Sequence, residues 1–228
     1  MRIIYFHQYF NTPDMPGSTR SYEFAKALIE MGHEVEMITT SQSGQKDNKW
    51  FETREAGIIV HWLPLKYSNH LNFFQRIKVY LAYAFKSFIK ALSIKGDLVF
   101  ASSTPLTIAI PGVLISKLQN IPLVFEVRDL WPDLPIAMKI LKNPILIYLS
   151  KLLETWAYKN SSSIVALSPE MKKGIVSKKV VPTKVAIIPN SSDLKQFEYN
   201  EKLSNNFRFI RPWLKNKPLL VYAGAFGK

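Results

Sequence analysis

Short apolar runs alternate with amphipathic stretches along almost the whole chain. The apolar runs are bounded by glycine, proline or polar turn residues, which predicts buried strands, and the stretches between them repeat apolar residues every three to four positions, which is typical of helices. Residues 41–55 are polar and are expected to form a loop. The alternation predicts an α/β fold, a Rossmann-like, doubly wound and mostly parallel sheet with helices on both faces. We expect about seven strands, at residues 3–6, 35–38, 58–63, 98–101, 123–125, 164–167 and 185–188, and helices at 24–31, 70–92, 106–118, 144–159 and from 169.

The C-terminal stretch departs from this alternation. Residues 200–217 are polar and basic, like a linker, and residues 218–223 are apolar and run into a glycine-bearing loop that ends in a lysine. A strand followed by such a loop is how a phosphate-binding turn begins. We therefore expect a first domain over 1–199, a linker, and the first strand of a truncated second domain; alternatively, this strand completes the first sheet. An apolar strand without partners is an association site, so residues 219–222 should pack on the parent domain or pair with another copy.

The predicted helix at 70–92 combines a wide apolar stripe with four cations and no acidic residue. One interpretation is a crossover helix whose stripe packs on the sheet while its lysines face water. The other is a basic amphipathic helix that lies on an anionic membrane surface. In that case its first turns, with Phe73, Phe74, Arg76 and Lys78, would contact the membrane.

Composition narrows the classes of partner. The net charge of +13 implies an anionic partner, which is a nucleic acid, a nucleotide or diphosphate ligand, or an acidic membrane. The lysines are scattered rather than gathered with aromatic residues, which argues against nucleic-acid binding. The chain has no cysteine, and its four histidines lack ligand-like spacing, so we expect no metal site. No run approaches about 18 uncharged apolar residues, and the start has no secretory signal features.

A charged segment follows the predicted strand at 123–125. Glu126, Arg128, Asp129 and Asp133 surround Trp131, and two prolines end the regular structure there. Open α/β sheets place their ligands at the carboxyl ends of parallel strands, which favours a binding site. The alternative is a surface loop whose charges pair internally.

A second polar loop, residues 11–20, precedes the first predicted helix and ends in Arg20. Backbone N–H groups at a helix N-terminus attract anions, and an arginine adds a fork for phosphate. The loop has one glycine, not the three of a dinucleotide-binding fingerprint, which disfavours a dinucleotide-dependent oxidoreductase. The alternative is an ordinary N-cap by Ser18 or Ser21 with a solvated Arg20. His7 ends the first strand nearby, where a ligand contact and a structural hydrogen bond are both open.

Residues 126–133, 16–20 and 188–193 resemble motifs in the N-terminal half of glycosyltransferase family 4, and residues 221–227 resemble the start of its second half. The resemblance is closest to bacterial fucosamine (N-acetyl-L-fucosamine) transferases of surface-polysaccharide synthesis. It implies the N-terminal domain of a GT-B fold and a retaining, metal-independent transfer without a cofactor. The donor would be a nucleotide-sugar, UDP-linked, and the acceptor a lipid-diphosphate-linked saccharide. Such an enzyme would be cytoplasmic and peripheral at the inner face of the cell membrane.

The resemblance also assigns roles to residues. It places Arg128, Asp129 and Asp133 near the acceptor hydroxyl as catalytic residues. Many family members carry a histidine in that loop, whereas this chain has Arg128 and Asp129, so the histidine's role is unassigned. Because most of the donor half is absent, this chain alone should not catalyse transfer; a basic nucleic-acid-binding module without catalysis is the alternative function. The residues assigned to the donor diphosphate and acceptor are Gly17, Ser18, Thr19, Arg20, Gly224, Gly227 and Lys228.

Overall fold

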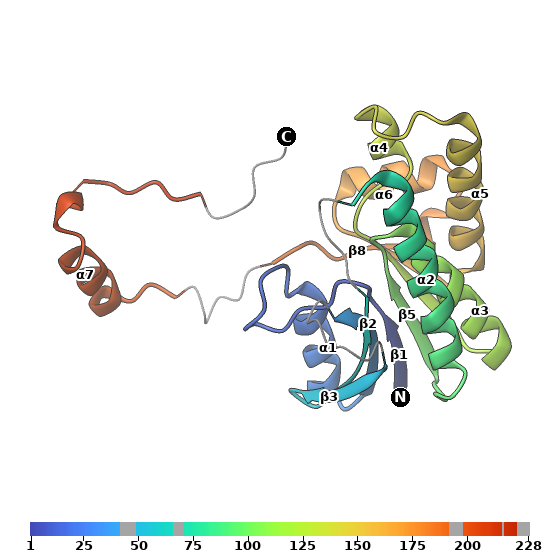
Figure 1. Ribbon diagram of the computed structural model, residues 1–228, viewed down its shortest axis with the longest axis horizontal. Coiled ribbons are helices and arrows are strands. Elements are labelled where there is room, and N and C mark those ends of the chain that lie inside the picture. The colour runs from blue at the N-terminus through green and yellow to red at the C-terminus, as the bar shows by residue number, and fades with distance from the viewer. Residues whose placement is uncertain (42–48, 66–70, 192–197, 216, 223–228) are drawn as a thin grey trace. The chain divides into compact units, whose positions relative to one another are not determined.

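The computed structural model describes residues 1–41, 49–65, 71–191, 198–215 and 217–222. The chain forms two compact units, Met1–Asn190 and Ser191–Lys228. The first unit contains an eight-stranded sheet in the order β3-β4-β2-β1-β5-β6-β7-β8 (Figure 1). All neighbouring strands are parallel except β3 and β4, which confirms the predicted doubly wound sheet. The strands are β1 (Arg2–Phe6), β2 (Glu34–Ser41), β3 (Phe51–Glu55), β4 (Ile58–Pro64), β5 (Leu98–Ser102), β6 (Leu123–Val127), β7 (Ser163–Ala166) and β8 (Val185–Ile187).

Strand β3 corrects the loop expected over residues 41–55. It pairs antiparallel with β4 through a two-residue turn, Ala56 and Gly57, whose φ angles are both positive. Such a turn matches the twist of a hairpin. The strand was missed because it lies at the sheet edge and exposes its charged residues, so its sequence is as polar as that of a loop.

Helices cover both faces of the sheet. Helix α1 (Arg20–Glu30) packs on one face over a core that includes Tyr5, Met37 and Trp62. Helices α2, α3, α5 and α6 pack on the other face over a core that includes Phe6 and Phe125. Parallel strands need such crossover helices, so both faces are apolar. The bounds are α2 (Phe73–Ala91), α3 (Ala109–Gln119), α4 (Asp133–Ala137), α5 (Pro144–Asn160) and α6 (Pro169–Ser177), with 3₁₀ helices η1 (Leu106–Ile108) and η2 (Pro182–Lys184).

The orientation of α2 differs from the crossover interpretation of its sequence. The side that packs on the protein carries Tyr83, Ala84, Ser87 and Ala91, all buried. This side combines the large Tyr83 ring, whose hydroxyl donates to the Ile38 carbonyl oxygen, with small side chains, and Phe88 also packs against the core. Much of the predicted apolar stripe is therefore exposed to solvent. Its exposed members are Phe74, Leu81, Phe85 and Leu92, between 49% and 70% accessible.

The second unit contains helix α7 (Glu201–Phe209) and the 3₁₀ helix η3 (Pro212–Leu214), within the stretch expected to be a linker. The described residues 217–222 form no strand. The unit boundary after Asn190 falls nine residues before the expected end of the first domain. No described helix is long and apolar enough to cross a membrane.

Candidate active site at the carboxyl edge of the sheet

The topology fixes where a ligand site is expected. Strand β1 lies between β2 and β5, and the chain extends from it in both directions across the sheet. The carboxyl ends of β1 and β5 therefore meet at the point where the strand order reverses, which is where open α/β sheets bind ligands. His7 directly follows β1, Ser102 ends β5, and Glu126 lies near the end of β6.

A buried ion pair forms the base of this region. Arg20 donates from Nε and Nη2 to Oε1 of Glu126, at 3.0 and 2.8 Å. Their side chains are only 10% and 1% exposed, and Ser102 donates its hydroxyl to the other carboxylate oxygen. Arg20 also donates to the carbonyl oxygens of Ile188 and Pro189, each at 2.8 Å. The arginine thus connects α1, β6 and the segment after β8.

These contacts bear on the predicted role of Arg20. The Arg20 side chain is only 10% exposed, so it is not solvated, and Glu126 compensates its charge inside the protein. Buried charges are stable when paired and fully hydrogen-bonded, which is the arrangement found here. The contact of Arg20 with donor phosphates stays a prediction.

Arg128 is in a different electrostatic situation. Its Nη1 donates to Nε2 of His7 at 3.0 Å and its Nη2 donates to the hydroxyl of Ser18 at 3.1 Å. Its backbone N–H donates to the hydroxyl of Ser103. Among the described residues, no carboxylate forms an ion pair with Arg128. A guanidinium has five N–H donors, so a partly exposed Arg128 held by neutral groups retains both charge and donors for an anion.

His7 is held in one protonation state. Burial and, secondarily, the nearby Arg128 charge lower the pKa of His7 to about 3. A guanidinium can only donate, so Nε2 of His7 accepts and its Nδ1–H donates to the hydroxyl of Ser21, at 2.7 Å. The neutral imidazole thereby fixes the position of Arg128 without neutralising its charge.

The loop before α1 supplies Gly17, Ser18 and Thr19. Gly17 has φ +135°, a conformation that favours glycine, and a Cβ there would also lie 2.5 Å from Nδ2 of Asn11. Ser18 is exposed and accepts the hydrogen bond from Arg128, while Thr19 caps α1 by position with no side-chain capping bond. The structure therefore brings the Ser18 loop together with Arg128, while the binding roles predicted for both stay predictions.

The two predicted aspartates have different surroundings. Asp129 is partly buried next to Arg128 and accepts a 3.0 Å hydrogen bond from Thr104. Asp133 instead lies on α4 and pairs at 2.6 Å with Lys178, the residue that follows α6. Lys178 also lies 3.6 Å from Glu154 of α5, whose pKa is raised by burial. The contacts thus join Asp129 to the loops of the site and Asp133 to neighbouring helices.

Sequence reasoning missed some members of the site. Ser103 and Thr104 hold the backbone of Arg128 and the carboxylate of Asp129, and neither was singled out. The available signal was the hydroxyl-rich run that directly follows the strand at 98–101, because ends of parallel strands share one edge. Glu126 was noted for its charge but not as the partner of Arg20, which lies 106 residues away.

The remaining predicted residues fall into two groups. Phe73, Phe74, Arg76 and Lys78 occupy the start of α2, where Phe74 is 70% exposed. Gly224, Gly227 and Lys228 fall outside the described residues. Within the described ranges, no three histidine, aspartate or glutamate side chains gather as metal ligands would.

Solved structures define the class of fold. Sucrose-phosphate synthase from Thermosynechococcus elongatus matches 91% of this chain with a TM-score of 0.64 and 11% identity. A second structure, from E. coli and described as trehalose-6-phosphate bound with UDP-2-fluoro glucose, matches 95% of this chain. The TM-score is 0.62 and the identity is 13%. Anabaena HepE in complex with UDP-glucose matches 95% with a TM-score of 0.52 and 13% identity. The chain spans 52%, 55% and 51% of these structures, and its fold is that of the Rossmann-like N-terminal domain of GT-B proteins.

Residues 17–191 match the family model of the glycosyl transferase 4-like domain. Because the match covers most of the chain, the protein belongs to this family. No curated protein is significantly similar to the sequence.

Proposed function

We propose that this chain is the acceptor-binding half of a retaining, metal-independent glycosyltransferase. The donor is a UDP-linked sugar, and the acceptor is a lipid-diphosphate-linked saccharide. The observation that carries the proposal is the charge of Arg128 at the strand-order switch point, beside Asp129 and without an ion pair to any described carboxylate. The family supports glycosyl transfer, and three solved structures of the same fold are described with UDP, a UDP-sugar or a UDP-sugar analogue.

The chemistry assigns each group a task. A sugar that leaves a diphosphate develops negative charge on phosphate oxygens, which preorganised donors stabilise. Arg128 supplies such donors because His7 and Ser18 hold its guanidinium by two hydrogen bonds. Asp129 orients the acceptor hydroxyl and takes its proton late in the reaction. Asp133 is the less suited aspartate, since its charge is paired with Lys178.

We further propose that the enzyme works at the inner face of the cell membrane, in surface-polysaccharide or O-antigen synthesis. The exposed Phe74 and Phe85 on a helix whose only charges are positive support a peripheral membrane contact. The net charge of +13 favours anionic lipid. N-acetylfucosamine is the donor sugar proposed, on the resemblance to fucosamine transferases.

The test is transfer from a panel of UDP-sugars to a prenyl-diphosphate-linked saccharide by the full-length protein. We expect Arg128→Gln and Asp129→Asn to lower kcat/KM by at least about a hundredfold, the size of a lost transition-state contact. Arg54→Gln, an exposed arginine on edge strand β3, is the matched control and should retain activity. A larger loss in Asp133→Asn than in Asp129→Asn would reassign the acid–base role.

Further measurements separate the remaining features. Product anomers identified by NMR decide between retention and inversion, and activity after chelation tests independence from metal. The 228-residue chain alone should give no transfer. If no nucleotide-sugar supports transfer and the chain binds DNA or RNA in a salt-sensitive manner, the basic nucleic-acid-binding alternative replaces this proposal.

A further inference from the structure

An apolar cavity of about 310 Å³ lies between α2 and α5, apart from the polar site. This volume is at the lower end of the range for ligand pockets. Its lining is mostly aliphatic and aromatic, and the charge at its wall is Arg76. The residues that define it are Phe73, Ile77, Trp131, Ile140, Leu149 and Leu153.

The cavity begins where the polar site ends. Pro105 lines the cavity and directly follows Thr104, the hydrogen-bond partner of Asp129. Trp131 lines it three residues after Arg128 in the same loop. Two loops at the carboxyl edge of the sheet therefore contribute polar groups to the site and apolar groups to the cavity.

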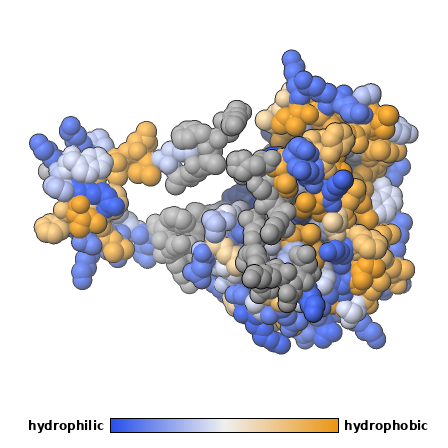
Figure 2. All heavy atoms as spheres, viewed as in Figure 1, coloured by the Kyte–Doolittle hydropathy of each residue, from blue (hydrophilic) through white to orange (hydrophobic). Residues whose placement is uncertain are grey.

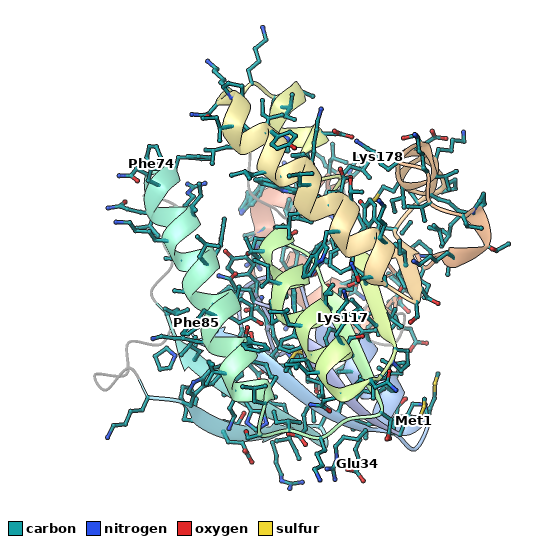
Figure 3. The ribbon with its side chains drawn as sticks, turned by 90° about the vertical axis from the view of Figure 1, so that its right-hand side faces the viewer. Met1, Glu34, Phe74, Phe85, Lys117 and Lys178 are labelled. Atoms are coloured by element: carbon teal, nitrogen blue, oxygen red, sulfur yellow. The ribbon has the colours of Figure 1, made fainter. Side chains whose placement is uncertain are left out.

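The surface around the cavity is unusually apolar for a protein in water. Apolar side chains gather over α2, α4 and α5 (Figure 2), and Phe74 and Phe85 point from α2 away from α3 and α5 (Figure 3). On α5, Ile145, Tyr148 and Leu149 are 67%, 62% and 53% exposed. Extended apolar patches of this kind mark interaction surfaces.

Positive charges predominate on this surface, since Asp133 of α4 and Glu154 of α5 both lie close to Lys178. Residues 71–96 carry five arginines and lysines, and residues 134–153 carry three lysines, with no aspartate or glutamate in either stretch. Lysines and arginines around an apolar surface suit lipid headgroup phosphates, with hydrocarbon below them. This complementarity favours a lipid over a second copy of the chain, whose equivalent surface would carry the same positive charge.

We propose that the cavity binds the hydrocarbon chain of the lipid-linked acceptor, while its diphosphate lies near Arg76 at the cavity wall. The inference rests on the proposed function for the identity of the lipid, but chain binding itself requires no donor and no transfer. If the cavity admits a hydrocarbon chain, the affinity for that ligand should rise roughly fourfold with each buried methylene, until the cavity is full. Partition into a bilayer or micelle has no such limit.

The experiment measures binding of alkyl phosphates with four to twelve carbons, below micelle formation, to the 228-residue chain by calorimetry. Ser150→Phe places a ring in the cavity wall, and Ser162→Phe, an exposed serine before β7, is the matched control. We expect affinity to rise with chain length and then level off, to fall at least tenfold in Ser150→Phe, and to be unchanged in Ser162→Phe. Circular dichroism and urea midpoints establish that both variants fold.

Headgroup placement is tested with farnesyl diphosphate and farnesol. Arg76→Gln should weaken farnesyl diphosphate binding severalfold and leave farnesol binding unchanged, whereas Ser150→Phe should weaken both. Equal binding of all chain lengths, or equal binding by the two serine variants, would overturn the proposal. So would a dimer whose dissociation exposes the cavity, because a second copy would then be the occupant.

The two proposals can fail separately. If the protein binds the hydrocarbon chains as expected but has no transfer activity, the lipid-binding role of the cavity is supported and the proposed transferase function is refuted. If the chain binds no alkyl phosphate and Ser150→Phe does not alter transfer to a prenyl-linked acceptor, the proposed transferase activity is supported and the proposed lipid-binding role of the cavity is refuted.

Discussion

The buried pair of Arg20 and Glu126 allows the sharpest test of the site's construction. Replacing Arg20 with methionine keeps most of the side-chain length but leaves the carboxylate, 1% exposed, with the Ser102 hydroxyl as its remaining side-chain donor. Breaking a buried ion pair from one side costs about 3–5 kcal/mol, because the other charge stays desolvated. The carbonyls of Ile188 and Pro189 also lose their donors. We therefore expect Arg20→Met to lower the free energy of unfolding by about 3–5 kcal/mol.

Urea unfolding of the 228-residue chain at pH 7 measures this change, provided the slope with denaturant stays constant. The double variant Arg20→Met/Glu126→Gln should recover at least about 2 kcal/mol relative to the sum of the single changes, since no buried charge then remains unpaired. Arg2→Met is the control: Arg2 pairs with Glu34 at 3.1 Å, but the side chains are 46% and 71% exposed, so the loss should stay within about 1 kcal/mol. An Arg20 loss no larger than the Arg2 loss, combined with lost UDP-sugar binding, would refute the structural role and make Arg20 a ligand-binding cation.

Three further changes test other parts of the structure. His7 has its pKa lowered to about 3, so between about pH 6.5 and 3 the unfolded chain binds a proton that the folded chain does not, and the free energy of unfolding decreases as the pH is lowered. His7→Gln should therefore reduce the slope of the unfolding free energy against pH, between pH 6 and 4, by about 1.4 kcal/mol per pH unit, and an unchanged slope would contradict the neutral imidazole. Gly17→Ala should cost about 1–3 kcal/mol in urea unfolding, because φ is +135° there and the new Cβ would meet the Asn11 amide. Gly32→Ala, at φ +84° with open space around Cβ, should cost less; equal losses would show that neither the φ angle of Gly17 nor the approach to Asn11 matters. Phe85→Ser, at a 67% exposed position, should change the free energy of unfolding by at most about 0.5 kcal/mol and should lower co-sedimentation with anionic vesicles severalfold. A large loss of stability would mean that another part of the protein covers this face.

The sequence determined the class of fold and the edge of the sheet that carries the site. Buried strands between two helical layers must be continuously apolar, so β1, β5 and β6 could be recognised from local pattern alone. The charged residues after residue 125 then had to lie at a carboxyl edge, because parallel strands end together. Edge strand β3 was not predictable in this way, since a strand with one solvated side has the polarity of a loop.

Only the tertiary structure decided how the charges combine. Arg20 and Arg128 both precede or follow predicted elements by similar distances, yet Arg20 pairs with Glu126 and Arg128 with neutral His7 and Ser18. The ion pair of Arg20 and Glu126 joins residues more than 100 positions apart, and local sequence patterns do not encode such a contact. The outward face of α2 was decided in the same way. Phe74 and Phe85 are apolar enough for a core, but the side that packs carries Tyr83, Ala84 and Ala91, because packing depends on how each side chain fits the space between elements and not on hydrophobicity alone.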